Sequence, residues 1–283
     1  MMPLIKLLRP RQWVKNAFVL APLFFAHRFL DVSSWELSLT AVLCFIGISS
    51  AVYVANDLHD VEEDRLHPKK CKRPLAAGSV SQLQALLLGL AMLAAAVFCM
   101  MRLPGGCALI AALYVWLNLL YTHLLKRIAI LDIFFIASCY VLRVLMGCYA
   151  LAVTVSPWII LTTFLLALFL GFSKRYHEMG YEAYAQSKPN LQHYNRNLLD
   201  RLITICGGAT LLTYAIYTAE VGLELGKVQL VYTVGFVAFG LFRYLQAIYV
   251  YNQGGEPESV LLKDKIQLAN VALWLITTMA IMF

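Results

Sequence analysis

The chain has 283 residues, of which 61% are hydrophobic and only 14% are charged. With a mean hydropathy of +0.71, this composition excludes an ordinary soluble domain and indicates an integral membrane protein. We attribute the formal net charge of +7 to membrane topology and anionic ligands, and we expect no nucleic acid as a partner.

Apolar segments recur along the whole sequence. A transmembrane helix needs roughly 20 mostly apolar residues, and nine segments approach this requirement: 16–30, 35–55, 82–101, 105–121, 130–150, 156–173, 198–220, 228–250 and 266–283. They predict an all-α, multi-pass membrane protein with nine transmembrane helices, which form a single integral membrane domain over residues 1–283. If the N-terminus is cytoplasmic, only Arg28, Arg102 and Lys227 fall on the opposite side of the bilayer, so the positive-inside rule favours this orientation.

Two polar residues next to the first predicted spans have two interpretations each. Lys15 lies where the first span begins, and it either obeys the positive-inside rule or contacts a phosphate. Tyr53 is either an interfacial tyrosine or a hydroxyl that contacts a sugar or phosphate. We favour the second role for Tyr53, because it shares a helical face with Asn56.

The stretch from Asn56 to Gly78, NDLHDVEEDRLHPKKCKRPLAAG, separates its charges, with acidic residues first and basic ones second. If the preceding helix continues, Asn56, Asp60 and Asp64 lie on one face, with Asp57 at its edge. Crowded carboxylates repel one another unless a cation lies among them, and oxygen donors suit Mg²⁺. The basic residues that follow, among them Lys70 and Arg73, would attract a phosphate. An ordinary solvated loop is the alternative, and the separation of charge makes the ligand site the better hypothesis.

Further basic residues occur at later cytoplasmic boundaries and inside one span. Lys126 lies in the turn at 121–129, and Arg143 lies within the span that follows. An arginine at that depth normally faces a cavity or an anion, although a structural role is the alternative. A second cytoplasmic loop, residues 173–197, begins with Lys174 and Arg175.

The pattern NDxxDxxxD, followed by RxHPxKxxRPxAxG, resembles the first aspartate motif of the UbiA superfamily of intramembrane prenyltransferases. The long form with HPxK is most similar to the branch that makes decaprenyl-phosphoryl phosphoribose. The family usually has a second aspartate motif where this chain has Lys174 and Arg175. This departure favours one magnesium-bound diphosphate and one bare phosphate over two aspartate motifs that bind a prenyl diphosphate.

The resemblance implies a helical bundle around a central cavity, in a bacterial inner (cell) membrane, with active-site loops at about 56–81 and 173–197 on the cytoplasmic side. It implies transfer of the phosphoribosyl group from 5-phosphoribosyl 1-diphosphate to a polyprenyl phosphate, with Mg²⁺ as cofactor, and it leaves a homo-oligomer open. The expected catalytic residues are Asp57, Asp60 and Asp64, and Mg²⁺ would be held by Asn56 and Asp60. The expected donor-binding residues are Lys15, Tyr53, Lys70 and Arg73, and the expected lipid-phosphate-binding residues are Lys126, Arg143, Lys174 and Arg175.

Two other functions stay open. One is an aromatic prenyltransferase that uses a prenyl diphosphate, against which the missing second acidic motif argues. The other is a transporter for an anionic metabolite, because charges within spans often mark permeation paths. The gathering of charged residues near one membrane face argues against the transporter.

Overall fold

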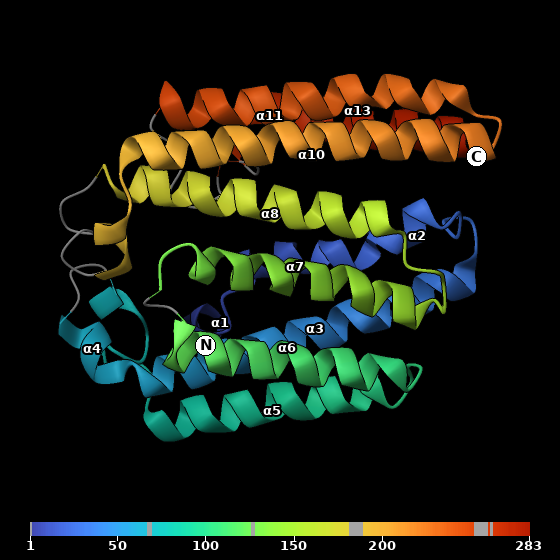
Figure 1. The fold of residues 1–283 in the computed structure, drawn as a ribbon. Helices are drawn as coiled ribbons and strands as arrows, with labels where there is room; N and C mark the ends of the chain where they lie inside the picture. The colour runs from blue at the N-terminus through green and yellow to red at the C-terminus, as the bar shows by residue number, and fades with distance from the viewer. Residues whose placement is uncertain (1, 67–69, 126–127, 181–188, 252–259, 261–262) are drawn as a thin grey trace. The chain divides into compact units, whose positions relative to one another are not determined.

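The protein is helical throughout the part that the structure describes (Figure 1). The structure is a computed structural model, and it describes residues 2–66, 70–125, 128–180, 189–251, 260 and 263–283. By packing, the chain divides into two compact units. Unit 1 comprises Met1–Leu125 and Leu142–Thr154, and unit 2 comprises Lys126–Val141 and Val155–Phe283.

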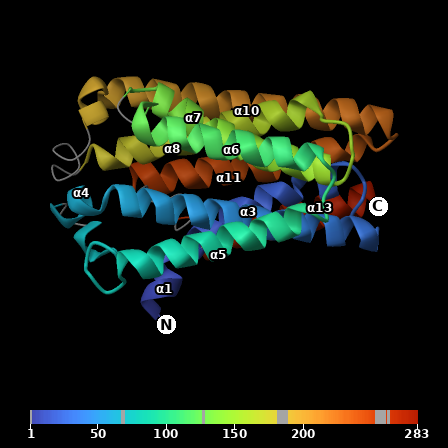
Figure 2. The same cartoon turned by 90° about the horizontal axis from the view of Figure 1, so that it is seen from below.

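Unit 1 is built around α3, which packs along α5 and also contacts the N-terminal segment and α6 (Figure 2). Its elements, in chain order, are α1 (Met2–Leu7), η1 (Pro10–Leu20), α2 (Ala21–Phe25), α3 (Val32–His59), α4 (Val61–Leu66), η2 (Lys70–Lys72), α5 (Gln82–Met100), α6 (Gly106–His123) and the second part of α7 (Leu131–Ala150). A Cβ at Gly147 would lie 2.0 Å from the carbonyl oxygen of Val19, so α7 touches the backbone of η1 at this point.

Unit 2 is built around the pair α8 and α10, which lie side by side. Its elements are the first part of α7, α8 (Pro157–Glu178), η4 (Pro189–His193), α10 (Arg196–Glu224), η5 (Val228–Thr233), α11 (Val234–Tyr249) and α13 (Lys265–Met282). Buried aromatic and aliphatic side chains from α8, α10 and α11 form its core, with Phe169 and Phe172 among the largest.

Local sequence signals explain where several helices begin. Asp31 caps α3 by accepting a hydrogen bond from the backbone N–H of Ser33, and Ser81 forms a capping box with Gln84 at the start of α5. The side chains of Asn195 and Asp264 likewise accept hydrogen bonds from backbone N–H groups at the starts of α10 and α13. These caps satisfy backbone N–H groups that have no partner within the helix.

Seven helices among the described residues are long and apolar enough to cross a membrane, and the predicted segment 105–121 forms the shorter apolar part of α6. The count of nine is not confirmed. The first predicted span, 16–30, covers the end of η1, the short helix α2 and the turn residues 26–30. Pro22 explains this difference, because proline lacks an N–H group and its ring clashes with the carbonyl of the residue four positions earlier in a continuous helix.

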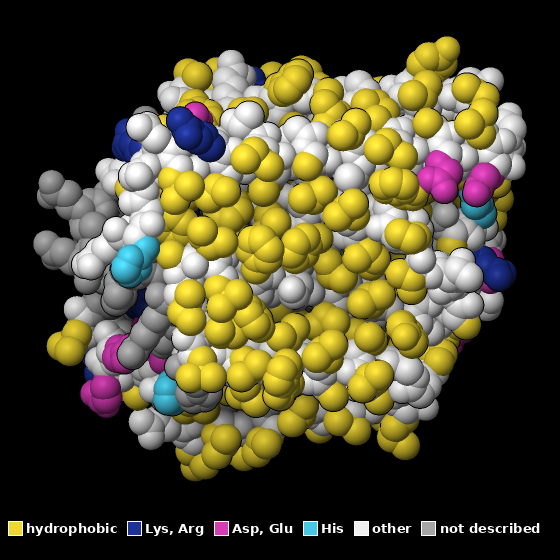
Figure 3. Space-filling model, in the orientation of Figure 1, with side chains coloured by type: hydrophobic (Ala, Val, Ile, Leu, Met, Phe, Trp, Pro, Cys, Tyr) yellow, Lys and Arg dark blue, Asp and Glu magenta, His cyan; other side chains and the backbone are white. Residues whose placement is uncertain are grey.

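The outer surface is largely apolar. On the face drawn in Figure 3, hydrophobic side chains cover the middle of the helices, and the charged side chains lie toward the helix ends. Helix α5 is typical, because its leucines at positions 83, 87 and 90 are exposed. An apolar surface of this extent is expected where helices face lipid.

Candidate active site

The candidate site in unit 1 lies where α3 ends and the chain turns into α4. Asp60 ends α3 by donating its backbone N–H to the carbonyl of Asn56 at 2.9 Å, and the N–H of Asp64 contacts the carbonyl of Asp60 at 2.8 Å. The two helices therefore follow each other closely and keep the polar residues of the motif together. A small core that includes Leu7 and Val54 supports this turn.

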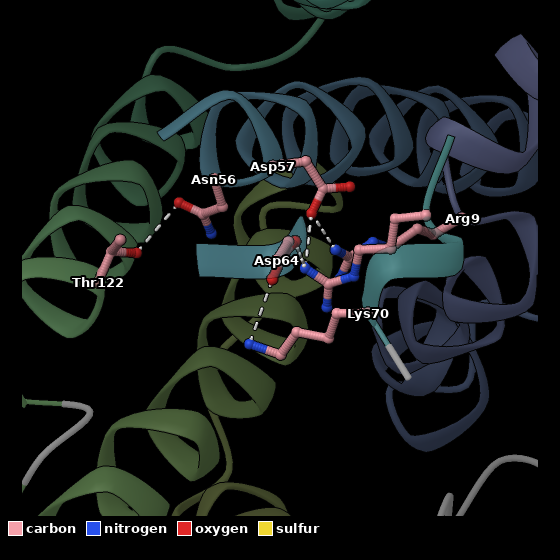
Figure 4. Close-up of polar contacts among 7 residues, drawn as sticks. Arg9, Asn56, Asp57, Asp64, Lys70 and Thr122 are labelled. Carbon is pink, nitrogen blue, oxygen red and sulfur yellow. Dashed lines mark hydrogen bonds and ion pairs between the residues drawn. The ribbon is translucent and has the colours of Figure 1, made fainter. Parts of the chain in front are cut away.

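Asp57 and Asp64 are buried carboxylates with cationic partners (Figure 4). One terminal nitrogen of Arg73 lies 3.0 Å from Oδ1 of Asp57 and 2.6 Å from Oδ2 of Asp64. The ammonium group of Lys70 lies 3.4 Å from Oδ1 of Asp64. The side chains of Asp57 and Asp64 are 3% and 2% exposed. Buried charges of this kind are stable only when they are paired.

The second cation at Asp57 comes from the N-terminal segment. Nη2 of Arg9 lies 2.5 Å from Oδ1 of Asp57, and its guanidinium carbon lies 4.8 Å from the centre of the Tyr53 ring. The backbone of Arg9 is left-handed, with a φ of 53°, although a residue before proline favours an extended conformation. Sequence reasoning missed Arg9, because nothing in its local pattern indicates a partner so distant in the chain.

Asn56 and Asp60 are the residues expected to hold a metal ion, and both are half-buried. Figure 4 shows Asn56 turned toward α6, where its side-chain oxygen accepts a hydrogen bond from Thr122 at 3.1 Å. The described residues contain no group of three or more His, Cys, Asp or Glu side chains that could hold a metal ion. Two oxygen donors one helical turn apart fit a magnesium ion that takes its other ligands from water and substrate phosphate.

The remaining donor-binding candidates fall into two groups. We call Arg9, Lys70 and Arg73 with the aspartates that they contact, Asp57 and Asp64, the cationic cluster. Two of the donor-binding candidates, Lys70 and Arg73, belong to it, and a third, Tyr53, lies beside Arg9. Lys15 is half-buried within η1, and its predicted phosphate contact stays a prediction. Lys126, predicted to bind the lipid phosphate, lies outside the described residues.

Arg143 is buried deep within unit 1, where it contacts neutral groups. Its Nε donates to Oδ1 of Asn16 at 3.0 Å, and its Nη2 donates to the hydroxyl of Tyr114 at 3.1 Å. The guanidinium carbon lies 5.7 Å from the centre of the Phe45 ring. Phe45 precedes Asp57 by twelve residues on α3, which corresponds to about 18 Å along a helix axis. This depth argues against a contact between Arg143 and a phosphate that reacts beside Asp57.

In unit 2, Lys174 and Arg175 differ in their surroundings although they are neighbours. Lys174 is half-buried. Arg175 is buried, with Nη2 at 2.6 Å from Oδ2 of Asp132 and Nη1 at 2.6 Å from Oε2 of Glu178. Because both terminal nitrogens contact carboxylates, this geometry argues against the lipid-phosphate contact predicted for Arg175. Asp132 lies in no sequence motif from which its pairing with Arg175 could have been predicted.

Comparisons with known proteins identify the family and the fold. The model of the UbiA prenyltransferase family matches residues 17–271. The chain is 32% identical to a decaprenyl-phosphate phosphoribosyltransferase from Mycobacterium tuberculosis, over 96% of this chain and 92% of the relative. It is 30% identical to the protein of the same name from Corynebacterium glutamicum, over 93% and 81%. A UbiA homolog from Archaeoglobus fulgidus, solved with GPP and Mg²⁺, has the same fold, with a TM-score of 0.73, 18% identity and coverage of 99% of both chains.

Proposed function

Because this chain belongs to the UbiA prenyltransferase family, we propose that it transfers the phosphoribosyl group of 5-phosphoribosyl 1-diphosphate to a polyprenyl phosphate of the decaprenyl type. The similarity to the mycobacterial phosphoribosyltransferase, which extends over 96% of this chain, is the observation that carries the proposal. The cationic cluster in unit 1 supports the proposal, because the cluster has more positive than negative charges and would attract an anionic donor.

The charge balance of the cluster favours a diphosphate ligand. Arg9, Lys70 and Arg73 bring three positive charges to the two buried carboxylates of Asp57 and Asp64. These cations can therefore contact the diphosphate as well as the aspartates. Arg73 is already held in place for this contact, because it is paired with both carboxylates. We assign Tyr53 and these three cations to donor binding. We assign Asp57 and Asp64 to holding the cations in position.

Asn56 and Asp60 would hold Mg²⁺ together with the diphosphate of the donor. The bound metal ion would neutralise the negative charge that develops on the leaving group. Arg9 and Arg73 would supply further positive charge to the same oxygens, and they are held in place before the reaction by Asp57 and Asp64. Preorganised charges of this kind stabilise a transition state without reorganisation.

The transfer needs no general base, because the acceptor is already an anion. An oxygen of the lipid phosphate forms a bond to C1 of the ribose, while the bond between C1 and the diphosphate oxygen breaks and the electron pair leaves with diphosphate. The residues of the chain contribute by placing donor and acceptor in line, which is a large part of catalysis when two substrates meet.

Lys126 and Lys174 are our candidates for the lipid phosphate. We assign Arg143 and Arg175 to supporting roles instead, because the first lies deep in unit 1 and the second contacts two carboxylates. With the N-terminus and both active-site loops on the cytoplasmic side, the donor would arrive from the cytosol and the acceptor from the bilayer. We propose nine membrane segments in total, with η1 and α2 as an irregular first one.

Paired transfer assays test this function. Purified protein in detergent, supplied with ribose-labelled 5-phosphoribosyl 1-diphosphate and decaprenyl phosphate, should form a labelled product that partitions into organic solvent. The matched reaction contains a labelled prenyl diphosphate and an aromatic acid acceptor. Label transfer in this second reaction alone would overturn the proposal in favour of an aromatic prenyltransferase.

A further inference from the structure

Four buried polar side chains of unit 2 form a connected cluster. We call Asp132, Arg175, Glu178 and Tyr194 the buried clasp. Arg175 contacts both carboxylates at 2.6 Å, and the hydroxyl of Tyr194 lies 3.3 Å from Oδ1 of Asp132 as a donor. The clasp joins the start of α7, the end of α8 and the segment that precedes α10.

The clasp also holds a strained turn. Ile130 has a φ of 68°, which is a rare and strained conformation for a β-branched residue. Its backbone N–H donates to the hydroxyl of Tyr194 at 2.5 Å. Burial, with a further contribution from the carboxylate of Asp132, raises the pKa of Tyr194 to about 12. The hydroxyl therefore stays protonated at neutral pH, and it can donate to Asp132 while it accepts from Ile130.

A close approach of two helices makes the clasp geometrically feasible. Gly171 lies one turn before Arg175 on α8, and a Cβ at this position would lie 2.5 Å from a methyl group of Ile133 on α7. Ile133 directly follows Asp132, so the absence of a side chain at Gly171 brings α8 to the start of α7. The arginine can then reach Asp132 from the neighbouring helix.

We propose that the buried clasp is a positioning device that fixes the end of α8, and thereby Lys174, for contact with the acceptor phosphate. Lys174 and Arg175 are successive residues of one helix, so their side chains leave the helix about 100° apart. Fixing Arg175 against two carboxylates therefore fixes the direction in which Lys174 leaves α8. The inference rests on the proposed function, because it takes Lys174 as a ligand of the lipid phosphate.

The test compares Tyr194→Phe with Lys174→Ala in the full-length protein in detergent. Equilibrium binding of tritiated decaprenyl phosphate is measured without turnover, and hydrogen exchange is measured at the amides of residues 173–178. Tyr194→Phe should weaken lipid binding about five- to tenfold, as expected for loss of a buried hydrogen bond, and should speed exchange at the end of α8. Lys174→Ala should weaken binding similarly but leave this exchange unchanged. Tyr232→Phe, an exposed tyrosine of unit 2, is the control and should change neither.

Two results would overturn the clasp as a positioning device. The first is that Tyr194→Phe speeds exchange but leaves lipid affinity unchanged, which would make the cluster merely structural. The second is that exchange at α8 stays as in the wild type. Gly171→Ala is a second variant, which should act in the same direction by pushing α8 away from Ile133. A wild-type protein that binds decaprenyl phosphate but transfers no phosphoribosyl group would refute the proposed function alone, since the binding and exchange results still judge the clasp.

Discussion

Arg9 and Asp57 are 48 positions apart in the chain, and their side chains meet at 2.5 Å. The contact joins the N-terminal segment to the last turns of α3, and it sets a positive charge next to a carboxylate that is 3% exposed. Removal of Arg9 takes one of two cationic partners from Asp57, which keeps Arg73. Removal of Asp57 takes the carboxylate that contacts Arg9. The pair therefore offers a direct way to test the proposal that the site binds an anionic donor.

Replacement of Arg9 by Ala should raise the KM for 5-phosphoribosyl 1-diphosphate about tenfold or more, because a hydrogen bond to a charged group contributes roughly 1.5–3 kcal/mol. Arg9→Lys should give an intermediate value, since lysine keeps the charge but not the planar fork. The control is Arg11→Ala, which changes an exposed arginine two residues away. An unchanged KM for Arg9→Ala would remove Arg9 from the donor site.

Replacement of Asp60 by Asn should lower kcat roughly 100-fold, because loss of a metal ligand weakens a contribution that is worth several kcal/mol. EDTA should abolish turnover by the wild type, and added Mg²⁺ should restore it. The amount of Mg²⁺ needed for half-maximal activity should be higher for the variant. Glu62→Gln, at an exposed residue of the same motif, should behave like the wild type. Normal turnover by Asp60→Asn would refute the metal assignment.

Replacement of Arg143 by Leu should destabilise the protein by about 1–3 kcal/mol, because Asn16 and Tyr114 lose a buried partner. The apparent Tm in detergent measures the loss. The KM values for both substrates should change less than about threefold. The double variant with Asn16→Leu should lose less stability than the sum of the single changes, as expected for residues in contact. A large and selective rise of the KM for the lipid would instead restore Arg143 as a phosphate ligand.

Asp264 allows a prediction about pH. It caps α13, and the hydrogen bond from Arg243 holds its pKa below the ordinary value of 3.8. A lowered pKa means that the charged form stabilises the fold at every pH above about 4, and that this contribution disappears as the pH falls through the lower folded-state pKa. The difference in Tm between the wild type and Asp264→Asn should therefore be constant from pH 8 to about pH 5 and should shrink below pH 4.

The matched variant Asp264→Ala separates the two roles of Asp264. Asparagine still caps a helix, whereas alanine does not, so Asp264→Ala should lose about 1 kcal/mol more than Asp264→Asn. This additional loss should persist at low pH, since it does not depend on the carboxylate charge. A difference between wild type and Asp264→Asn that grows on acidification would contradict the direction of the pKa shift.

The class of fold and the motif that forms the candidate site could be predicted because both depend on local sequence. Hydropathy alone identifies α3, α5, α7, α8, α10 and α13, and the spacing of Asn56, Asp57, Asp60 and Asp64 identifies the motif. The first span could not be predicted in the same way. Its composition is apolar, but Pro22 interrupts the helix, and mean hydropathy does not register the missing N–H group.

Two partners of the charged residues could not be predicted, because Arg9 lies 48 positions from Asp57 and Asp132 lies 43 positions from Arg175. The sequence suggested that the aspartates need a metal ion to offset their repulsion, whereas Arg9, Lys70 and Arg73 contact Asp57 and Asp64. The sequence also predicted Arg175 to be a phosphate ligand, because its carboxylate partner Asp132 could not be identified from the sequence. Its partner Asp132 lies 43 positions earlier, on a different helix, and no short motif connects the two.

The contact between Gly147 and the carbonyl of Val19 has a consequence for the interpretation of natural variants. Any side chain at position 147 would have to displace η1, the segment that begins just after Arg9. A substitution there changes no charged group and lies far along the sequence from the acidic motif. A variant survey that ranks harm by proximity to the acidic motif would therefore classify Gly147 as tolerant, although it governs how closely η1 packs against α7.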